Sequence, residues 1–493
     1  MRVGTPAWVG DAVFYQIFPD RFATSARVPK PGHLEPWSAP PTNYGYKGGD
    51  LLGVAERLDE LVDLGIDAVY LNPIFQAASN HRYNAYDYLA VDPLLGGDGA
   101  LRELLDVAHD RGVRVILDGV FNHVGRGFWP FHHVLESGAA SPYRDWFYLD
   151  EAVLHGRAGV QAYGVPRGGA ASERGYRSWW DVPSLPKLRV EHPPVREYLL
   201  SVAEHWLRFG IDGWRLDVPQ DVDDPTFWPE FRARARAVNP EAYLLGEIWE
   251  EAPEWLAGDR FDALMNDPLG TSILSFVGGP DLDAEVIAGQ ANYARAIRAL
   301  DGPAFAERLT RLAAVYEPAV AAVQYNLIGS HDTPRARSVM GGSVERLRLA
   351  TLLQLILPGA PAIYYGDEIA MEGAADPDCR RSYPPAGKPL AEEAAAMRAF
   401  VRAAIRTRRN DVALRRGEVR VAAARERWIL LERTAEGRRA IAAVNAGDEP
   451  VEIHARLDGL TGLDLPGMPA AVVREGGASI VVPPLAGGVF VQS

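Results

Sequence analysis

Cysteine is almost absent from this chain of 493 residues, since Cys379 is the only one. A single thiol excludes an internal disulfide framework and any zinc site built from several cysteines. Long hydrophobic runs are also missing: the longest apolar stretch, residues 352–365, is too short to span a membrane and is interrupted by Pro358 and Pro361. The first residues lack the apolar segment of a signal peptide. These absences predict a soluble protein of the cytoplasm.

Positive charge is in short supply as well. The chain has 51 Lys and Arg residues against 65 Asp and Glu residues, which gives a formal net charge of −14. Proteins that bind nucleic acids or anionic membranes need clustered Lys and Arg to neutralise phosphate, so neither is an expected partner. The charge balance favours a neutral substrate.

Short runs rich in β-branched and aromatic residues alternate with helical segments, which is typical of a parallel sheet covered by helices. Two of the expected helices, residues 51–64 and 100–111, are each followed by a glycine that can end a helix. Eight strands are expected, at residues 12–19, 68–75, 114–121, 213–218, 242–249, 261–266, 323–328 and 360–365. Eight strands in this alternation predict an α/β fold, a (β/α)8 TIM barrel, over residues 1–407.

Two segments depart from this alternation. A stretch of about 60 residues rich in Gly, Pro, Trp and Tyr separates His123 from the next clear helix near Val195. It predicts a subdomain inserted after the third strand, over residues 124–188. After about residue 408 the pattern changes to short strand-like pieces separated by Gly, Asp and Pro turns, which predicts a C-terminal antiparallel β-sandwich over residues 408–493.

Four short polar stretches follow expected strands, and they contain the residues of greatest chemical interest. Catalytic groups of a TIM barrel lie at the carboxyl ends of the strands, so all four stretches are expected to meet on one face. The candidate residues in them are Asp118 and His123 at the end of the third strand, Arg215 and Asp217 at the end of the fourth, Glu247 at the end of the fifth, and His331 and Asp332 after the seventh.

Arg215 and Asp217 are two residues apart on one strand, so both side chains point into the barrel. The pair could be a structural salt bridge, but a guanidinium beside Asp217 would also keep a nucleophilic carboxylate ionised. Glu247 follows an apolar run, and apolar surroundings raise a carboxyl pKa, as a proton donor requires. Its structural alternative is pairing with a Lys or Arg. Two carboxyl groups with these roles are what glycosidic bond cleavage needs.

Other polar and aromatic residues have alternatives of the same kind. His331 and Asp332 could cap the helix that follows, and Asp118 and His123 could be turn residues. Tyr83, in the loop after the second strand, lies at the same barrel face and is a candidate for stacking on a sugar. Five aromatic residues of the insertion could contact sugars or form the core of the subdomain. They are Trp146, Phe147, Tyr163, Trp179 and Trp180.

In this order, the motifs resemble those of the α-amylase family of glycoside hydrolases, from residues 14–22 to the C-terminal sandwich. By this resemblance Asp217 is the nucleophile, Glu247 the acid/base, and Asp332 the third acid, which holds hydroxyls of the reacting glucose. The remaining matches are to substrate-binding residues of the family: Tyr83, Asp118, His123, Arg215 and His331.

Within the family, residues 184–189 and 326–333 resemble the cyclomaltodextrinase, neopullulanase and maltogenic amylase group. Arg189 stands where that group usually has Asn, and residues 219–221, Pro-Gln-Asp, replace its usual Ala-Asn-Glu. The first expected strand begins near residue 12, which leaves no room for the N-terminal β-sandwich domain typical of the group. The preference for α-1,4 or α-1,6 bonds, the preference for cyclodextrins and the oligomeric state stay open.

The resemblance implies a retaining hydrolase of neutral α-glucans such as maltooligosaccharides and cyclodextrins. Its two catalytic carboxyl groups are expected about 5–5.5 Å apart. A transglycosylase or trehalose synthase-type enzyme is the alternative on the same scaffold, and a non-catalytic carbohydrate-binding protein is the remote one. No cofactor is required. Asn122 matches a calcium ligand of the family, but Asp221 stands where the α-amylase motif has His, and no oxygen-rich loop follows Asp20.

Overall fold

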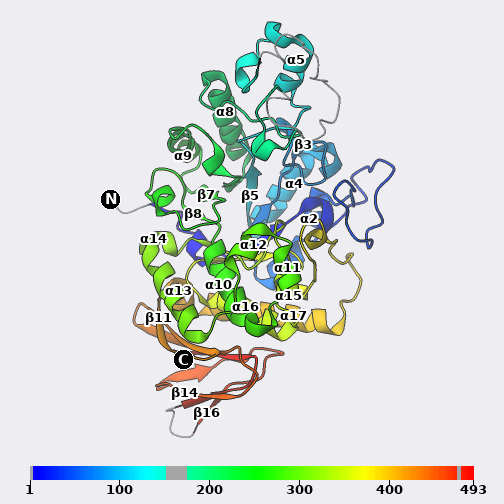
Figure 1. Ribbon diagram of the computed structural model, residues 1–493. Coiled ribbons are helices and arrows are strands. Elements are labelled where there is room, and N and C mark those ends of the chain that lie inside the picture. Colours follow the sequence, from blue (N-terminus) through cyan, green and yellow to red (C-terminus); the bar gives the residue numbers. More distant parts are fainter. Residues whose placement is uncertain (1–3, 151–174, 475–478, 493) are drawn as a thin grey trace.

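The computed structural model describes residues 4–150, 175–474 and 479–492. At its centre, eight parallel strands follow one another in the order β8-β7-β6-β5-β2-β1-β10-β9. Figure 1 shows helices around these strands. They are β1 (Phe14–Ile17), β2 (Ala68–Leu71), β5 (Arg114–Gly119), β6 (Gly213–Leu216), β7 (Tyr243–Gly246), β8 (Ala263–Leu264), β9 (Tyr325–Asn326) and β10 (Ala360–Tyr364). A parallel bridge between Met265 and Tyr325 joins the two edge strands. The sheet closes into the predicted (β/α)8 barrel, and every predicted strand is present.

Apolar side chains fill the interior of the barrel near the amino ends of its strands. Phe14, Tyr243 and Tyr325 are the first residues of their strands, and all three are fully buried. The ring of Phe14 lies with its centroid 5.6 Å from that of Tyr243 and 5.4 Å from that of Tyr325. Strands buried on both faces need nearly continuous apolar runs, which is the pattern the sequence shows. This packing leaves polar side chains to gather at the carboxyl ends.

Helices cover the outside of the barrel. The helix predicted over residues 51–64 is two helices, because the N–H of Arg57 donates to the Val54 carbonyl in a tighter turn than an α-helix has. The predicted ends hold: Gly65 is left-handed with φ of 103°, and Gly112 with φ of 73° follows the second helix. The helices up to the fifth strand are α1 (Pro19–Phe22), α2 (Leu51–Glu56), α3 (Leu58–Leu64), α4 (Gly97–Asp110), α5 (Trp129–Ser137), α8 (Pro193–Phe209) and α9 (Phe227–Val238).

Further helices follow the fifth strand of the barrel, both between the remaining strands and after the last one. They are α10 (Asp267–Gly278), α11 (Ala284–Ala288), α12 (Ala291–Ala296), α13 (Gly302–Val315), α14 (Pro318–Ala321), α15 (Ala336–Val339), α16 (Val344–Ile356), α17 (Glu392–Asn410) and α18 (Val412–Arg416). None of the helices within the described ranges is long and apolar enough to cross a bilayer.

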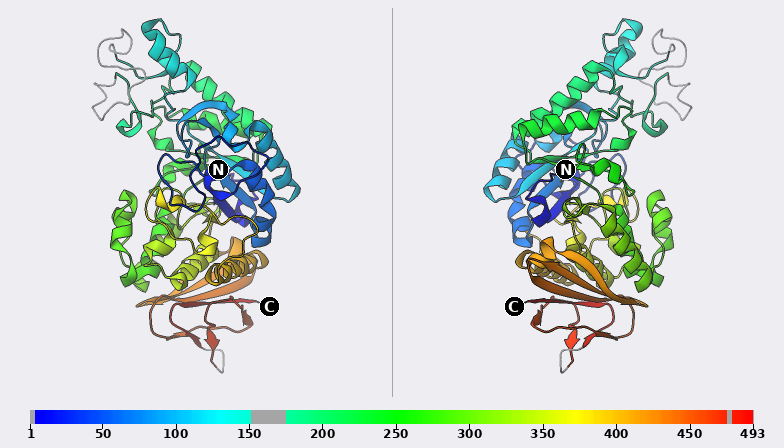
Figure 2. Two further views of the ribbon diagram at one scale, coloured as in Figure 1. Left: turned by 90° about the vertical axis from the view of Figure 1, so that its right-hand side faces the viewer. Right: turned by 90° about the vertical axis from the view of Figure 1, so that its left-hand side faces the viewer.

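The described parts of the segment between β5 and α8 project from the carboxyl end of the barrel, opposite the C-terminal sheets (Figure 2). The core of the segment includes Phe147, whose ring lies 5.0 Å from that of Phe131, and Phe131 in turn lies 5.0 Å from Tyr176. An antiparallel bridge from His123 to Lys187 joins the two ends of the segment near the barrel, and a bridge from Phe147 to Leu188 lies within the segment. Phe147 is therefore a core residue of the insertion.

Two antiparallel sheets follow the barrel and pack face to face. The first contains β11 (Glu418–Arg425), β12 (Trp428–Ala435), β13 (Arg438–Asn445), β18 (Ala486–Gln492) and β15 (Leu460–Gly462), and the second contains β14 (Val451–His454), β17 (Ser479–Val482) and β16 (Val472–Val473). Ile441, Ile453, Ile480 and Phe490 form part of the core between them. The predicted C-terminal sandwich is present. Helix α17 runs through residue 408, and the first sandwich strand begins at Glu418.

Candidate active site

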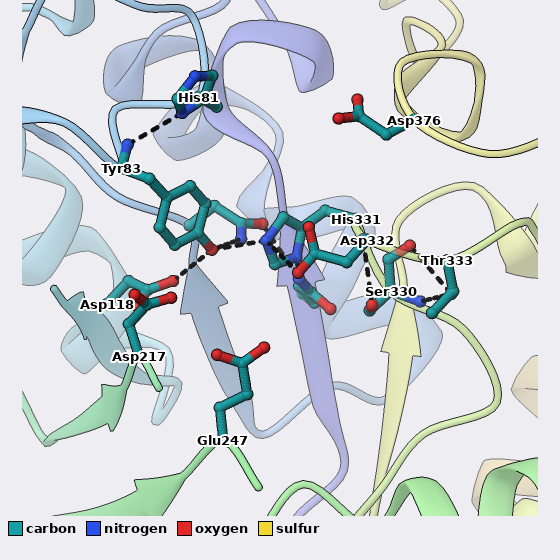
Figure 3. A network of polar contacts seen from close by, with 12 residues as sticks. His81, Tyr83, Asp118, Asp217, Glu247, Ser330, His331, Asp332, Thr333 and Asp376 are labelled. Carbon is teal, nitrogen blue, oxygen red and sulfur yellow. Dashed lines mark hydrogen bonds and ion pairs between the residues drawn. The ribbon is translucent and has the colours of Figure 1, made fainter. Parts of the chain in front are cut away.

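Three neighbouring strands bring three acids to one mouth of the barrel. Asp118 lies in β5 and pairs with Arg215 of β6, while Asp217 and Glu247 directly follow β6 and β7. Their backbones continue the parallel ladder, since Asp217 N–H donates to Gly119 O and Glu247 N–H to Leu216 O, both at 3.0 Å. The ladder fixes the direction in which these side chains leave the barrel (Figure 3).

Arg215 lies at the centre of the three acids and is fully buried. Its Nη1 donates to Asp118 Oδ1 and to Asp217 Oδ1, both at 2.9 Å, and its Nη2 lies 2.8 Å from Glu247 Oε2. Glu247 also accepts from the backbone N–H of Val218 at 3.1 Å. The structural alternatives for these residues, a salt bridge between Arg215 and Asp217 and the pairing of Glu247 with an arginine, are therefore both present. One guanidinium cannot neutralise three carboxylates.

Burial raises the pKa of both acids that follow the strands. It raises the pKa of Glu247 to about 7, with the negative charge of Asp332 adding to the rise and Arg215 acting against it. Burial, and then the charge of Glu247, raises the pKa of Asp217 well above its ordinary value. Arg215 acts in favour of the ionised form of Asp217, whereas burial and the repulsion of Glu247 act against it. Arg215 therefore restrains the rise of both pKa values.

His331 is held in its neutral form with a defined tautomer. The Gln16 side-chain amide donates through Nε2 to Asn72 Oδ1 at 3.1 Å and to His331 Nδ1 at 2.9 Å. In this arrangement Nδ1 of His331 accepts, so the ring proton is on Nε2. Burial lowers the pKa of His331 to about 3, so the ring is uncharged at neutral pH. Its Nε2–H faces the mouth of the barrel.

Tyr83 connects the two sides of the site. It lies between β3 (Phe75–Ala77) and β4 (Ala85–Val91), in the excursion that follows β2. Its ring stacks on His331, with centroids 5.3 Å apart and planes 3° from parallel, and its hydroxyl donates to Asp118 Oδ2 at 2.8 Å. His331 Nε2 lies 2.6 Å from the Tyr83 hydroxyl and 3.0 Å from Asp332 Oδ2. One hydrogen-bonded network therefore joins Asp118 to Asp332.

Asp332 does not cap a helix, because α15 begins at Ala336 and its N-cap, Arg335, makes no side-chain cap bond. Its Oδ1 accepts instead from Arg380 Nη2 at 3.1 Å, and Arg380 Nε donates to the His331 carbonyl at 2.8 Å. Burial opposes ionisation of Asp332, but His331 and Arg380 outweigh it and lower the pKa. Asp332 is therefore the acid of the site that is most readily ionised.

His123 lies on the side of the site that faces the insertion. Burial lowers its pKa to about 3, so its ring is neutral. The ring stacks on Trp179 with centroids 5.0 Å apart and planes 17° from parallel. Trp179 Nε1 donates to Asp221 Oδ2 at 2.7 Å, so Asp221, in the loop after Asp217, holds this tryptophan in place.

A model of the α-amylase catalytic domain matches residues 16–432. The chain belongs to the α-amylase family. It is 41% identical over 461 residues to a cyclomaltodextrinase of Geobacillus thermopakistaniensis, covering 92% of this chain and 72% of that relative. It is also 41% identical over 420 residues to neopullulanase 2 of Thermoactinomyces vulgaris, covering 84% and 66%. The debranching enzyme of Nostoc punctiforme matches all of both chains, with 39% identity and a TM-score of 0.86. This chain thus spans about two thirds to three quarters of the two curated relatives.

Asn122 was predicted as a possible calcium ligand, but its side chain provides only one oxygen for such a site. The Asn122 amide points its Nδ2 to His123 Nδ1 at 3.3 Å, and its Oδ1 is buried without a hydrogen bond. A single amide oxygen is not a site, since calcium takes six to eight oxygen ligands. Across residues 4–150, 175–474 and 479–492, no three His, Cys, Asp or Glu side chains are grouped to hold a metal. No step of the chemistry is therefore assigned to calcium.

Several residues of the site have no motif that the sequence analysis used. Tyr70 donates to Asp118 Oδ2 at 2.5 Å from inside the barrel. Arg380 and Asp376, 2.9 Å apart, come from the loop after β10. Asp267, the first residue of α10, is buried, and burial followed by the charge of Glu247 raises its pKa well above the ordinary value. Position after a strand could have indicated Asp267 alone, because Tyr70 lies within β2 and Arg380 and Asp376 lie well beyond the end of β10.

The aromatic residues predicted in the insertion have different fates. Trp146 packs beside Tyr198, with ring centroids 5.6 Å apart, and lies against the hydrophobic core. Trp179 stacks on His123 at the site, whereas Trp180 is 77% exposed. Tyr163 lies outside the described residues.

Proposed function

We propose that this member of the α-amylase family is a retaining hydrolase of α-glucans, with Asp217 as nucleophile, Glu247 as acid/base and Asp332 as the third acid. The observation that carries the proposal is the sharing of the buried Arg215 by Asp217 and Glu247, whose pKa values are both raised. Two buried carboxyls that repel each other retain a proton at neutral pH. A retaining glycosidase needs one protonated and one ionised carboxyl at the start of its cycle.

The reaction then has two balanced steps. Glu247 donates its proton to the glycosidic oxygen as the bond from that oxygen to the anomeric carbon breaks, and Asp217 attacks this carbon to form a β-glucosyl ester. Glu247, now ionised, takes a proton from water while the water oxygen attacks the same carbon and releases Asp217. Hydrolysis thus returns both carboxyls to their starting states.

The other members of the network bind and orient the glucose unit. Asp332, held by Arg380 and facing Nε2 of His331 at 3.0 Å, offers an ionised carboxylate to sugar hydroxyls. Tyr83 offers an aromatic face beside them, and its hydroxyl is fixed by Asp118. Arg215 stabilises the carboxylate that remains when Glu247 has given up its proton.

The substrate class is a neutral glucan with α-1,4 bonds, and α-1,6 bonds are included in the proposal. Similarity to proteins named cyclomaltodextrinase, neopullulanase 2 and debranching enzyme supports both linkages. A transglycosylase is the second candidate, because an acceptor sugar can replace water in the second step with the same residues. The single, buried Cys379 favours a reducing compartment, and a cytoplasmic location is part of the proposal.

The test is product analysis with maltotriose, β-cyclodextrin, pullulan, starch and trehalose, with the anomeric proton followed by NMR from the first turnover. We expect cleavage of at least one α-1,4-linked glucan with the α-anomer formed first. Early formation of the β-anomer would contradict the role of Asp217 as nucleophile. Products longer than the substrate would select the transglycosylase, and cleavage of none of the five would overturn the proposal.

A further inference from the structure

A stack of three rings runs from the buried site to the protein surface. His123 is fully buried and stacks on Trp179, which in turn stacks on Trp180 with centroids 4.8 Å apart and planes 17° from parallel. Trp180 is 77% exposed, so the stack ends at solvent. The three rings lie nearly parallel, which makes the outer face of Trp180 a continuation of a surface that starts at the site.

The backbone at Trp180 is in an unfavourable conformation. Its φ of 47° and ψ of 34° place it in the left-handed region, which a bulky side chain rarely adopts, and Asp181 follows with φ of 57°. Because the indole of Trp180 is exposed, its burial contributes little free energy to offset this backbone strain. Neither the backbone nor the side chain of Trp180 therefore favours folding, and strain that the surrounding fold maintains points to a function.

The stack is anchored to the loop that follows Asp217. The short helix η6 (Pro219–Asp221) ends at Asp221, whose carboxylate accepts from Trp179 Nε1 at 2.7 Å. Lys187 Nζ donates to the Asp221 carbonyl at 2.6 Å and lies 3.1 Å from Asp223 Oδ2. The hydrogen bond to Asp221 holds the indole of Trp179, and Lys187 and Asp223 form an ion pair beside it. The stack is thus joined by a hydrogen bond to the loop that follows Asp217, and its exposed member is an uncharged indole.

We propose that Trp180 is a stacking platform for a glucose unit of the glucan chain that lies outside the pocket of the reacting glucose. The apolar C–H face of a pyranose packs on a flat, uncharged indole, and the stack on Trp179 presents the indole in a fixed position. This inference rests on the proposed function for the choice of glucan as the occupant. It makes Trp180 a determinant of chain-length preference.

The kinetic test compares Trp180→Ala with Trp129→Ala. Trp129 is a matched control, because it is 60% exposed on α5 of the same insertion, and among the described residues its ring lies near those of His132 and His133, with centroids 6.2 and 5.8 Å away. We expect Trp180→Ala to raise KM for maltoheptaose relative to KM for maltotriose by about three- to tenfold. Trp129→Ala should leave that ratio unchanged, and Trp180→Phe should restore most of it.

A second variant separates binding from folding. Asn tolerates the left-handed region, so Trp180→Asn should keep or raise the melting temperature while it changes the KM ratio as Trp180→Ala does. A ratio that is the same in Trp180→Ala, Trp180→Asn and Trp129→Ala would overturn the inference.

A binding experiment keeps this result distinct from the fate of the proposed function. Calorimetry with maltoheptaose, in the Asp217→Asn background so that no turnover occurs, should show a Kd about three- to tenfold weaker when Trp180 is replaced by Ala. If the wild-type protein cleaves no glucan but this difference is found, the platform stands and the proposed function falls. If glucans are cleaved and the Kd does not change, the proposed function stands and the platform falls.

Discussion

Each end of the barrel buries an arginine, and the two arginines have opposite surroundings. At the carboxyl end, Arg215 faces the carboxyl groups of Asp118, Asp217 and Glu247. At the amino end, Arg408 of α17 donates to backbone carbonyls, including those of Gly359 at 2.6 Å, Leu355 at 2.9 Å and Leu414 at 3.1 Å. These carbonyls belong to the segments just before β10 and just before the C-terminal sandwich. Arg408 therefore joins barrel and sandwich.

The pKa values of the two guanidiniums move in opposite directions. Burial lowers the pKa of Arg408 to about 10, since its neighbours are carbonyl dipoles. Burial also acts to lower the pKa of Arg215, but Asp118 and Glu247 outweigh it and raise the value. Carbonyls satisfy a buried cation at little cost to themselves, whereas crowded carboxylates destabilise one another. Repulsion among buried acids, more than burial of charge, marks the functional end of the barrel.

The largest effect is expected from removing either carboxyl beside Arg215. Asp217→Asn and Glu247→Gln should each lower kcat/KM by about a thousandfold or more, because each step of hydrolysis needs both groups. The melting temperature of Asp217→Asn should be equal to or above that of the wild type, since burial and repulsion disfavour its charge. Calorimetric unfolding and assays with maltotriose measure both quantities. A fully folded variant with a tenth of wild-type activity would contradict the role of the replaced residue.

Replacing the arginine at the other end should have the opposite outcome. Arg408→Met leaves several buried carbonyls without a donor, so we expect the free energy of unfolding to fall by about 3 kcal/mol. The specific activity of the folded fraction should stay within about twofold of the wild-type value, because the candidate catalytic residues lie at the opposite, carboxyl end of the barrel. Arg402→Met is the control on the same helix, because Arg402 makes an exposed ion pair with Asp63. Urea unfolding should show a change of under about 1 kcal/mol for that control.

The contrast between the two ends also explains what the sequence could predict. Strands buried on both faces produce apolar runs with a glycine-ended helix between them, and all eight were found from that pattern. The helix over residues 51–64 was predicted as one piece because its apolar spacing continues through Arg57. The tighter turn at Arg57 depends on a backbone hydrogen bond to Val54, which leaves no trace in the spacing.

Site residues could be predicted where they stand next to a strand, but not where they lie within a long loop. Asp217 and Glu247 stand next to clear strands, so their convergence follows from the barrel alone. Arg380 reaches His331 and Asp332 across 49 and 48 positions of sequence, from a loop without periodicity. The upward shift of the Asp217 pKa could not be predicted from its neighbour Arg215, because the effect of burial depends on the whole fold.

A smaller loss of activity is expected from Arg380, which acts through its two partners at the mouth. Arg380→Met removes a charge-assisted hydrogen bond to Asp332 and a donor to the His331 carbonyl, so kcat/KM should fall by about ten- to a hundredfold. Arg380→Lys keeps the charge and should recover part of the loss, which a merely structural role would not require. Arg381→Met is the matched control, since Arg381 pairs with Asp378 at the surface. Equal losses in Arg380→Met and Arg381→Met would contradict a positioning role for Arg380.

The smallest effect is on the pH profile, and its sign follows from the raised pKa of Glu247. The acid must be protonated in the free enzyme, so kcat/KM for neutral maltotriose should fall through a midpoint near pH 7. Beyond the midpoint the fall is about tenfold per pH unit.

The same group binds its proton more tightly in the folded than in the unfolded protein, where the pKa is near 4.5. Its contribution to stability is therefore complete below pH 4.5 and declines as the pH rises to about 7. The negative charge of Asp332 contributes to the raised pKa of Glu247, so Asp332→Asn should lower that pKa. The residual activity of Asp332→Asn should therefore fall with rising pH at a lower midpoint than that of the wild type. An unchanged midpoint in Asp332→Asn would show that burial alone sets the pKa of Glu247, and that repulsion across the mouth does not distinguish this end of the barrel from the other.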